Sequence, residues 1–279
     1  MTTAATRLHL SQPAVTRRLQ RLEAELGVEL FDRHAKPLAA TAAGRAALDK
    51  GRRILQSVDD LLALVNGQPS GDFRLGISMS VAALALARPI DELRKAYPRV
   101  AFEVVTGWSP SLIQQVRQGS LDMAFVTCLD GERSAADPEP IILGHHPLVF
   151  VASHTMRLPK LVEPQALGDA TWVLNPHGCT FRHALHQVLQ AAGVPLRTAV
   201  EVYGWDLQLS LVARGVGLGL FPAWIVARSR LGPRVRTFRI RGFDFRAQFG
   251  SVHGHMLPTL EPVAAALDRA LSDQIRTLR

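Results

Sequence analysis

The sequence of 279 residues lacks the features that mark several common classes of protein. It contains two cysteines, Cys128 and Cys179, which do not make a disulfide framework. No apolar run reaches the roughly 18 residues needed to cross a bilayer. The N-terminus also has no hydrophobic core of a secretion signal. We therefore expect a soluble cytoplasmic protein without a membrane partner.

Motifs of the common enzyme classes are absent as well. There is no GxSxG turn, no phosphate-binding loop and no GxGxxG after a strand. Residues 215–219 (GVGLG) lead into a predicted strand rather than out of one, so they are not a dinucleotide fingerprint. Four possible zinc ligands lie close together but match no common zinc spacing: His177, Cys179, His183 and His186. We expect no enzymatic activity, no metal and no cofactor.

Charge is distributed unevenly along the chain, whose formal net charge is +8. Residues 1–53 contain ten Arg or Lys residues and five Asp or Glu residues, which gives +5. The remainder holds 22 basic and 19 acidic residues, which gives +3. Such an N-terminal excess of positive charge is typical of a segment that binds a polyanion.

A short amphipathic helix is predicted within this basic segment, beginning near Ser11 and ending at Gly27. Ser11 is a favourable N-cap, and Pro13 is tolerated in the first turn, where backbone N–H groups lack helical partners. Helical spacing predicts a buried apolar stripe of Val15, Leu19, Leu22 and Leu26. The opposite face carries side chains that can contact bases and phosphates: Gln12, Thr16, Arg17, Gln20 and Arg21. Solvent exposure is the commoner role of a charged face.

The flanking segments extend this pattern towards DNA recognition. Residues 2–8 are expected to form a preceding helix, and residues 9–10 the turn between the two helices. Residues 29–31 and 38–40 are expected to pair as a small hairpin. Basic residues at its tip, including Arg33 and Lys36, are typical of a wing that touches the DNA backbone.

Three segments resemble, in order and spacing, the winged helix-turn-helix of LysR-type transcriptional regulators: LHLSQPAV (8–15), LEAELGVELFDR (22–33) and TAAG (41–44). The resemblance implies that four residues face bases: Gln12, Pro13, Thr16 and Arg17. Four others would lie nearer the backbone: Ser11, Arg18, Arg33 and Lys36. In the family another helix precedes the position of Thr2, so residues 1–40 are expected to lack the first helix. Either the start was assigned too far downstream, which we favour, or the protein is genuinely shortened.

Thr41 can cap a longer helix that is predicted to run to about Asn66, before a linker at residues 67–71 (GQPSG). Apolar residues recur in it at heptad-like spacing: Ile54, Val58, Leu61 and Val65, with Leu48, Leu55 and Leu62 seven residues apart. Packing on its own domain is the alternative role for this stripe. A helix of this length between domains favours pairing with its copy, so we expect residues 41–67 to support a homodimer or, from two dimers, a homotetramer.

From Phe73 onward strands and helices alternate, which favours an α/β fold with mostly parallel sheets. Strands are expected at 73–78, 101–106, 121–127, 148–152, 171–174, 199–202, 217–221, 235–240 and 247–252, and helices at 81–97, 110–118, 181–192, 205–214, 223–230 and 258–278. The resemblance implies that residues 71–279 form an effector domain similar to a periplasmic binding protein. Lobe one would comprise 71–153 and 253–279, and lobe two 154–252.

Ligands of open α/β sheets bind beyond the carboxyl ends of strands. Three such ends here carry hydroxyls or glycines, and the resemblance implies that they converge: Ser78, Ser80, Thr127, Cys128, Pro176, Gly178 and Thr180. Hydroxyl and backbone N–H groups suit a small anionic effector, although Ser and Thr at such junctions are often helix caps. The resemblance adds Trp205 and Phe221, with core packing as the alternative for Trp205. Arg182 would hold the anion or be an ordinary surface arginine.

We therefore expect a DNA-binding transcriptional regulator whose partners are double-stranded DNA, a small effector and its own copies. The alternative is a solute-binding module that does not bind DNA, because its helix-turn-helix is truncated. Salt-dependent retention on DNA separates the two, since a regulator loses affinity steeply with salt.

Overall fold

The computed structural model describes residues 5–6, 10–32, 35, 38–48, 50–51, 54–55, 58, 69–84, 86–130, 138–244 and 246–278. The chain divides into two compact units, Met1–Val58 and Asp59–Arg279. Across these described ranges, no helix is long and apolar enough to cross a membrane.

The N-terminal unit contains the predicted helix and hairpin. Helix α2 (Gln12–Leu26) ends where Gly27 adopts a left-handed conformation with φ of 68°. Strands β1 (Phe31–Asp32) and β2 (Ala39–Ala40) pair antiparallel. Another helix begins after Thr41, whose Oγ1 accepts a hydrogen bond from the Gly44 N–H at 2.9 Å. Thr41 is therefore the cap that the sequence predicts.

The predicted heptad stripe is described in part. Residues 42–48, 50–51, 54–55 and 58 are helical. Their large apolar side chains are exposed: Leu48, Ile54, Leu55 and Val58. Other predicted positions lie outside the described residues: Leu61, Leu62 and Val65. The same holds for the helix predicted at residues 2–8, apart from two helical residues, Ala5 and Thr6.

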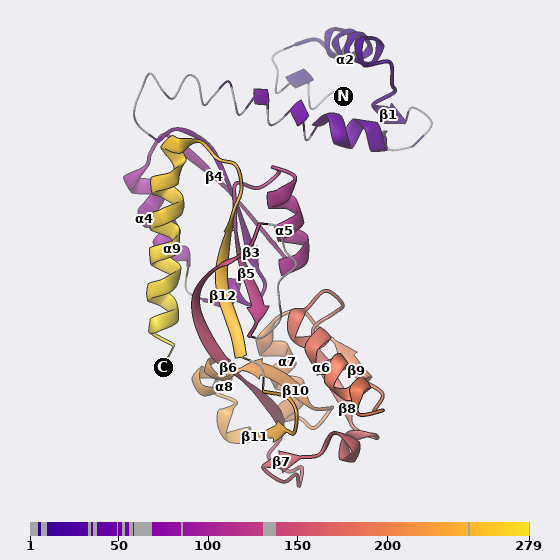
Figure 1. Ribbon diagram of the computed structural model, residues 1–279, viewed down its shortest axis with the longest axis vertical. Helices are drawn as coiled ribbons and strands as arrows, with labels where there is room; N and C mark the ends of the chain where they lie inside the picture. Colours follow the sequence, from indigo (N-terminus) through magenta and orange to yellow (C-terminus); the bar gives the residue numbers. More distant parts are fainter. Residues whose placement is uncertain are drawn as a thin grey trace. The chain divides into compact units, whose positions relative to one another are not determined.

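Lobe one of the C-terminal unit is a parallel sheet with helices beside it (Figure 1). Strand β3 lies between β4 and β5. The strands are β3 (Gly71–Ser78), β4 (Val100–Gly107) and β5 (Met123–Leu129). The helices are η1 (Val81–Ala83), α4 (Ala87–Ala96), α5 (Ser109–Arg117), η4 (Pro258–Leu260) and α9 (Glu261–Arg276).

Lobe two combines short strands with helices. Its strands are β7 (Leu161–Val162), β8 (Thr171–Leu174), β9 (Arg197–Glu201), β10 (Gly219–Pro222) and β11 (Val235–Ile240). Its helices are η2 (Pro164–Leu167), α6 (Thr180–Ala191), α7 (Trp205–Ala213), α8 (Ala223–Arg228) and η3 (Gly232–Arg234). Strands β8 and β9 pair in parallel, as do β7 and β11. Strand β7 was not predicted, because two residues are too few to show a period.

Two long strands run through both lobes. Strand β6 (Ile141–Ser153) pairs antiparallel with β12 (Arg246–His253) over residues 141–147, and with β10 and β11 over residues 148–153. Strand β12 also pairs antiparallel with β5. The prediction of mostly parallel sheets is therefore wrong, because crossing strands join the lobes without βαβ connections. Strand β6 also begins well before residue 148, where the sequence predicted it to start.

The helix predicted over residues 81–97 is interrupted. Leu84 is extended (φ −79°, ψ 149°), and α4 begins at Ala87. A continuous helix would place Pro89 in its interior, where proline lacks an N–H and its ring clashes with the preceding turn. The restart at Ala87 places Pro89 in a first turn, where no N–H is needed.

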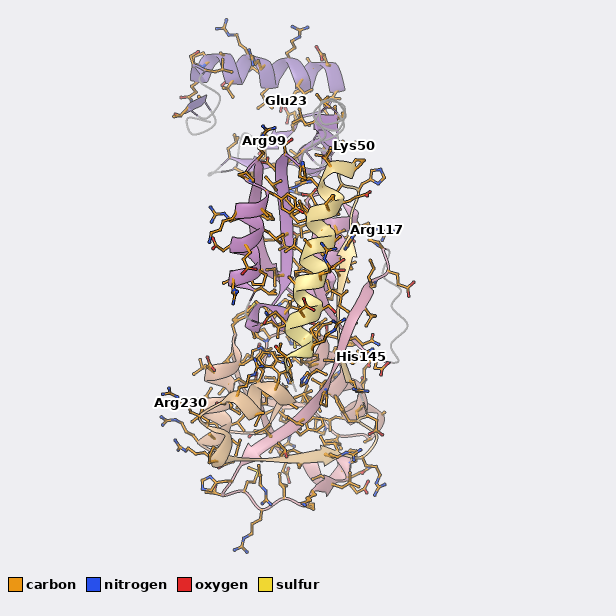
Figure 2. All side chains as sticks on the ribbon, turned by 90° about the vertical axis from the view of Figure 1, so that its left-hand side faces the viewer. Glu23, Lys50, Arg99, Arg117, His145 and Arg230 are labelled. Carbon is orange, nitrogen blue, oxygen red and sulfur yellow. The ribbon has the colours of Figure 1, made fainter. Side chains whose placement is uncertain are left out.

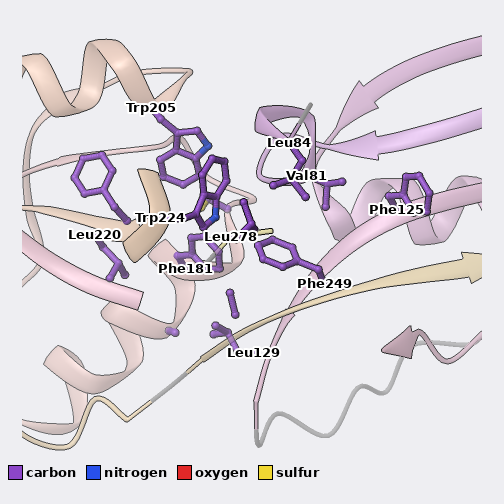
Figure 3. Packing of buried hydrophobic residues seen from close by; sticks show 14 of the residues in the cluster. Val81, Leu84, Phe125, Leu129, Phe181, Trp205, Leu220, Trp224, Phe249 and Leu278 are labelled. Carbon is purple, nitrogen blue, oxygen red and sulfur yellow. The ribbon is translucent and has the colours of Figure 1, made fainter. Parts of the chain in front are cut away.

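An apolar core extends through both lobes (Figure 3). It includes Val81 and Phe125 from lobe one and Phe181, Trp205 and Leu220 from lobe two. The lobes are therefore joined by buried side chains as well as by the crossing strands.

A buried ion pair joins the strands of lobe one. The Asp122 side chain has no exposed surface and accepts hydrogen bonds from the Arg74 backbone N–H (2.7 Å), Nε (3.0 Å) and Nη2 (2.6 Å). Arg74 Nη1 also donates to the Gly119 carbonyl oxygen at 3.0 Å. Both charged groups are thus hydrogen-bonded, as a buried pair requires.

We expect Asp122→Asn to lower the free energy of unfolding by about 3–5 kcal/mol, because it leaves the Arg74 guanidinium largely buried without its counter-charge. Urea unfolding followed by tryptophan fluorescence measures this change, since all four tryptophans lie in the C-terminal unit. Asp91→Asn is the matched control: its exposed pair with Lys95 should contribute about 0.5 kcal/mol or less. Equal losses in the two variants would contradict the expectation.

Candidate DNA-binding face and effector site

The Ser11 hydroxyl, at the start of α2, is not hydrogen-bonded to the helix. Ser11 is the N-cap, as predicted, but its side chain makes no capping hydrogen bond. The reason is local: Pro13 has no N–H, and the Ala14 N–H donates to the Ser11 carbonyl oxygen at 3.0 Å. The hydroxyl can therefore bind another group at the end of the helix.

The predicted DNA-facing side of α2 is accessible. Five of its residues are exposed: Ser11, Gln12, Pro13, Arg17 and Arg18. Thr16 is half-buried, and its hydroxyl donates to the Gln12 carbonyl oxygen at 3.0 Å. Arg21 pairs with Glu25 at 3.0 Å along the exposed helix. The two remaining predicted contacts, Arg33 and Lys36, lie outside the described residues.

The buried stripe predicted for α2 is wrong in its second half. Leu22 is 44% exposed and Leu26 is 50% exposed, whereas Glu23 is 8% exposed. The Glu23 carboxylate is buried because it accepts hydrogen bonds from the Leu30 N–H (2.8 Å) and the Phe31 N–H (3.3 Å). Periodicity alone could not find this residue, since an acid in an apolar stripe normally faces water.

Hydroxyl groups from both lobes meet at the end of β5. Ser78 Oγ lies 3.1 Å from Thr127 Oγ1, and both side chains are buried. From lobe two, Thr180 Oγ1 donates to the Thr127 carbonyl oxygen at 3.3 Å. Ser109 Oγ accepts from the Thr127 N–H at 2.9 Å. We call Ser78, Ser109, Thr127 and Thr180 the hydroxyl seam.

Two aromatic residues continue the contact between the lobes. The ring of Trp108, which precedes α5 in lobe one, stacks on Tyr203 of lobe two with centroids 6.1 Å apart. A Cβ on Gly178 would lie 2.8 Å from Trp108 Cδ1, so this glycine leaves space for the indole. Neither Trp108 nor Ser109 was predicted at the site. They follow β4, a fourth strand end at the same edge, and this position was the signal that could have found them.

The other predicted effector residues have varied positions. Trp205 and Phe221 are buried in the core, where their ring centroids lie 5.8 Å apart (Figure 3). Core packing, the alternative role for Trp205, is therefore what the structure has. Ser80 is buried at the start of η1, whereas Cys128 and Pro176 are half-buried.

Arg182 is not an ordinary surface arginine, because its side chain is only 11% exposed and makes its contacts within lobe two. Its guanidinium donates to the Asn175 carbonyl oxygen at 3.0 Å and to Glu201 Oε1 at 2.6 Å. It thereby ties the segment before α6 to β9. Asn175 is held further by Gln208, a fully buried side chain that also donates to the Val173 carbonyl oxygen at 2.8 Å. These contacts fix the position of the segment that carries Gly178.

The cysteine and histidine residues near α6 do not gather around one point. Where side chains are described, no group of three His, Cys, Asp or Glu residues is placed to hold a metal ion. Burial raises the pKa of the Cys179 thiol, so this thiol is protonated at neutral pH and is a poor nucleophile.

Comparison with known families agrees with this architecture. A family model described as "LysR substrate binding domain" matches residues 66–272, which is well over half of the chain. The chain belongs to the LysR family of transcriptional regulators. A second model, "Bacterial regulatory helix-turn-helix protein, lysR family", matches residues 1–45. The regulator thus combines a DNA-binding helix-turn-helix with a ligand-responsive effector domain.

Individual relatives cover most of the regulator. The transcriptional regulator YofA of Bacillus velezensis is 30% identical over 223 residues, which are 79% of this chain and 74% of YofA. A full-length OxyR variant from Pseudomonas aeruginosa is 22% identical with a TM-score of 0.69, covering 99% of this chain and 89% of that one. CbnR complexed with its target DNA is 24% identical with a TM-score of 0.59, covering 99% and 93%. At these identities the two structures show the shared fold.

We expect Gly178→Ala to loosen the contact between the lobes, since its Cβ would collide with Trp108. Gly193→Ala is the matched control: both glycines have positive φ (97° and 71°), but nothing lies within 4 Å of a Cβ at Gly193. Each variant should lose about 1–2 kcal/mol of stability from backbone strain. Gly178→Ala alone should increase quenching of tryptophan fluorescence by acrylamide. The same quenching in both variants would argue against the contact.

Proposed function

We propose that α2 reads the base sequence of double-stranded DNA while the flanking residues hold the phosphate backbone. Four residues would face bases: Gln12, Pro13, Thr16 and Arg17. Four would bind the backbone: Ser11, Arg18, Arg33 and Lys36. The exposure of the N-terminal part of α2, the uncommitted Ser11 hydroxyl and the basic N-terminal segment support this division.

We further propose that a small anionic effector binds at the hydroxyl seam. Its contacts would come from Ser78, Ser80, Thr127, Cys128, Pro176, Gly178 and Thr180, with Trp205 and Phe221 as the apolar wall behind them. The observation that carries this proposal is the hydrogen bond from Thr180 to the Thr127 carbonyl oxygen, which joins the two lobes at their strand ends. Hydroxyl donors there suit a carboxylate or a phosphate.

Oligomerisation would use the helix that follows Thr41. Exposed Leu48, Ile54, Leu55 and Val58 would pair with a second copy to form a homodimer, from which a homotetramer can be built. The DNA-binding segment, residues 1–40, would be joined through residues 41–67 to the two lobes. Lobe one would comprise residues 71–153 and 253–279, and lobe two residues 154–252. Together they would act as one regulator in the cytoplasm, where its DNA lies. The protein would have no catalytic activity, since its ligand would be sensed rather than converted.

We expect Arg17→Ala to relax sequence preference and Arg33→Ala to weaken binding to all sequences alike. A bidentate base contact contributes about 1–3 kcal/mol of discrimination, whereas a phosphate contact carries no sequence information. The measurement compares affinity for a duplex selected by the wild-type protein with affinity for mixed-sequence duplex. If both variants lose the same affinity for both duplexes, the division of roles is wrong.

We expect Thr180→Val to lower affinity for the effector roughly 10- to 100-fold, because a hydrogen bond to a charged group contributes about 1.5–3 kcal/mol. The probes are small carboxylates and inorganic phosphate, screened first by the thermal shift of the wild-type protein. Thr171→Val is the control, since Thr171 bonds to the Val216 carbonyl oxygen within lobe two. If Thr180→Val binds the effector with wild-type affinity, Thr180 is not part of the site. If only neutral compounds stabilise the protein, the effector is not an anion.

A further inference from the structure

The segment between α2 and the hairpin is held from two sides. On one side stands Glu23, labelled in Figure 2, whose buried Oε1 accepts hydrogen bonds from the Leu30 N–H (2.8 Å) and the Phe31 N–H (3.3 Å). Because Phe31 opens β1, this carboxylate connects the recognition helix directly to the first strand of the wing.

On the other side stands the start of the next helix. The Thr41 N–H donates to the Leu30 carbonyl oxygen at 3.0 Å, and Thr41 Oγ1 donates to the Glu29 carbonyl oxygen at 2.7 Å. Gly44 lies against the same residue, since a Cβ there would be 2.0 Å from the Leu30 carbonyl oxygen. We call Glu23, Leu30, Thr41 and Gly44 the Leu30 junction.

Stability alone does not favour an acid at position 23. Burying a carboxylate costs free energy even when it is hydrogen-bonded. Glu23 also lies in the last turns of α2, where the helix dipole disfavours negative charge. The carboxylate instead fixes a geometry, since its two hydrogen bonds set the orientation of the Leu30–Phe31 backbone relative to the helix axis.

We propose that Glu23 is a positioning residue for DNA binding. Through the Leu30 junction it holds the hairpin at the angle to α2 at which both reach one DNA duplex together. This inference rests on the proposed contacts of α2 and of the wing with DNA. It adds that a residue whose charge repels phosphate is nevertheless needed for DNA affinity, because its side-chain oxygen accepts the hydrogen bonds that hold the hairpin.

The test compares two acids of the same helix in the full chain. Glu23→Ala should weaken binding to mixed-sequence duplex DNA and make the plot of log affinity against log salt shallower by about one for each phosphate that the protein no longer neutralises. Glu25→Ala removes the same charge from the exposed side, where Glu25 pairs with Arg21. It should leave affinity unchanged or raise it. Glu23→Gln keeps an oxygen that accepts from Leu30 and should restore most of the affinity and the slope.

A second pair approaches the junction from the other helix, so the test does not depend on the folding of one variant. Thr41→Val removes the hydroxyl that bonds to Glu29 and Gly44 and should also give a shallower slope, whereas Thr41→Ser should not. A purely structural role would reduce the fraction of active protein without changing the slope.

The outcomes distinguish failure of the positioning role from failure of the proposed DNA binding on which it rests. Wild-type protein that shows no salt-dependent binding to duplex DNA would overturn the proposed DNA contacts. The positioning role would be overturned if the wild-type protein binds DNA but Glu23→Ala behaves like Glu25→Ala. It would also be overturned if Glu23→Ala and Thr41→Val both keep the wild-type salt slope.

Discussion

The antiparallel pairing of β6 with β12 is the constraint on which the arrangement of the C-terminal unit depends. Strand β12 also pairs with β5 of lobe one, and the second half of β6 pairs with β10 and β11 of lobe two. Two glycines permit this crossing. A Cβ on Gly250 would lie 2.6 Å from the Ile141 carbonyl oxygen, and one on Gly144 would lie 2.6 Å from a methyl group of Ile275. A single backbone ladder therefore determines where the strand ends of the two lobes meet.

Thr127 lies at this meeting point, and its position explains why hydroxyls gather there. The ladder between β3 and β5 covers Met123–Phe125, so Thr127 lies beyond it and its polar groups need other partners. Ser109 accepts from its N–H, and Thr180 donates to its carbonyl oxygen. Leaving such a buried group without a partner costs about 1–3 kcal/mol. The hydroxyl seam therefore satisfies a structural requirement of the contact between the lobes, and the effector that we propose would use the same donors.

Local patterns in the sequence predicted local structure well and predicted long-range contacts poorly. The bounds of α2, the presence of the β1–β2 hairpin and the Thr41 cap follow from neighbouring residues and are confirmed. The first strand of the hairpin lies at residues 31–32 rather than at the expected 29–31. The burial of Glu23 depends on Leu30, seven residues away, and the position of Arg182 depends on Glu201. Neither contact produces a periodic pattern in the sequence. The roles of the predicted DNA and effector contacts stay predictions, because they concern molecules that bind to these surfaces.

The Leu30 junction and the hydroxyl seam share one physical arrangement. In each, the N–H and the carbonyl oxygen of one residue at a strand end are held by side chains or backbone from two different elements. A small shift of either element leaves a polar group without its partner, and the cost rises steeply once the hydrogen bond is broken. Such contacts resist gradual movement, so the elements that they join change between discrete arrangements instead. A ligand can change the balance of these arrangements only by as much as it binds one more tightly than the other. At the proposed effector site, the free energy that a ligand must supply would therefore grow with the number of these hydrogen bonds that it replaces.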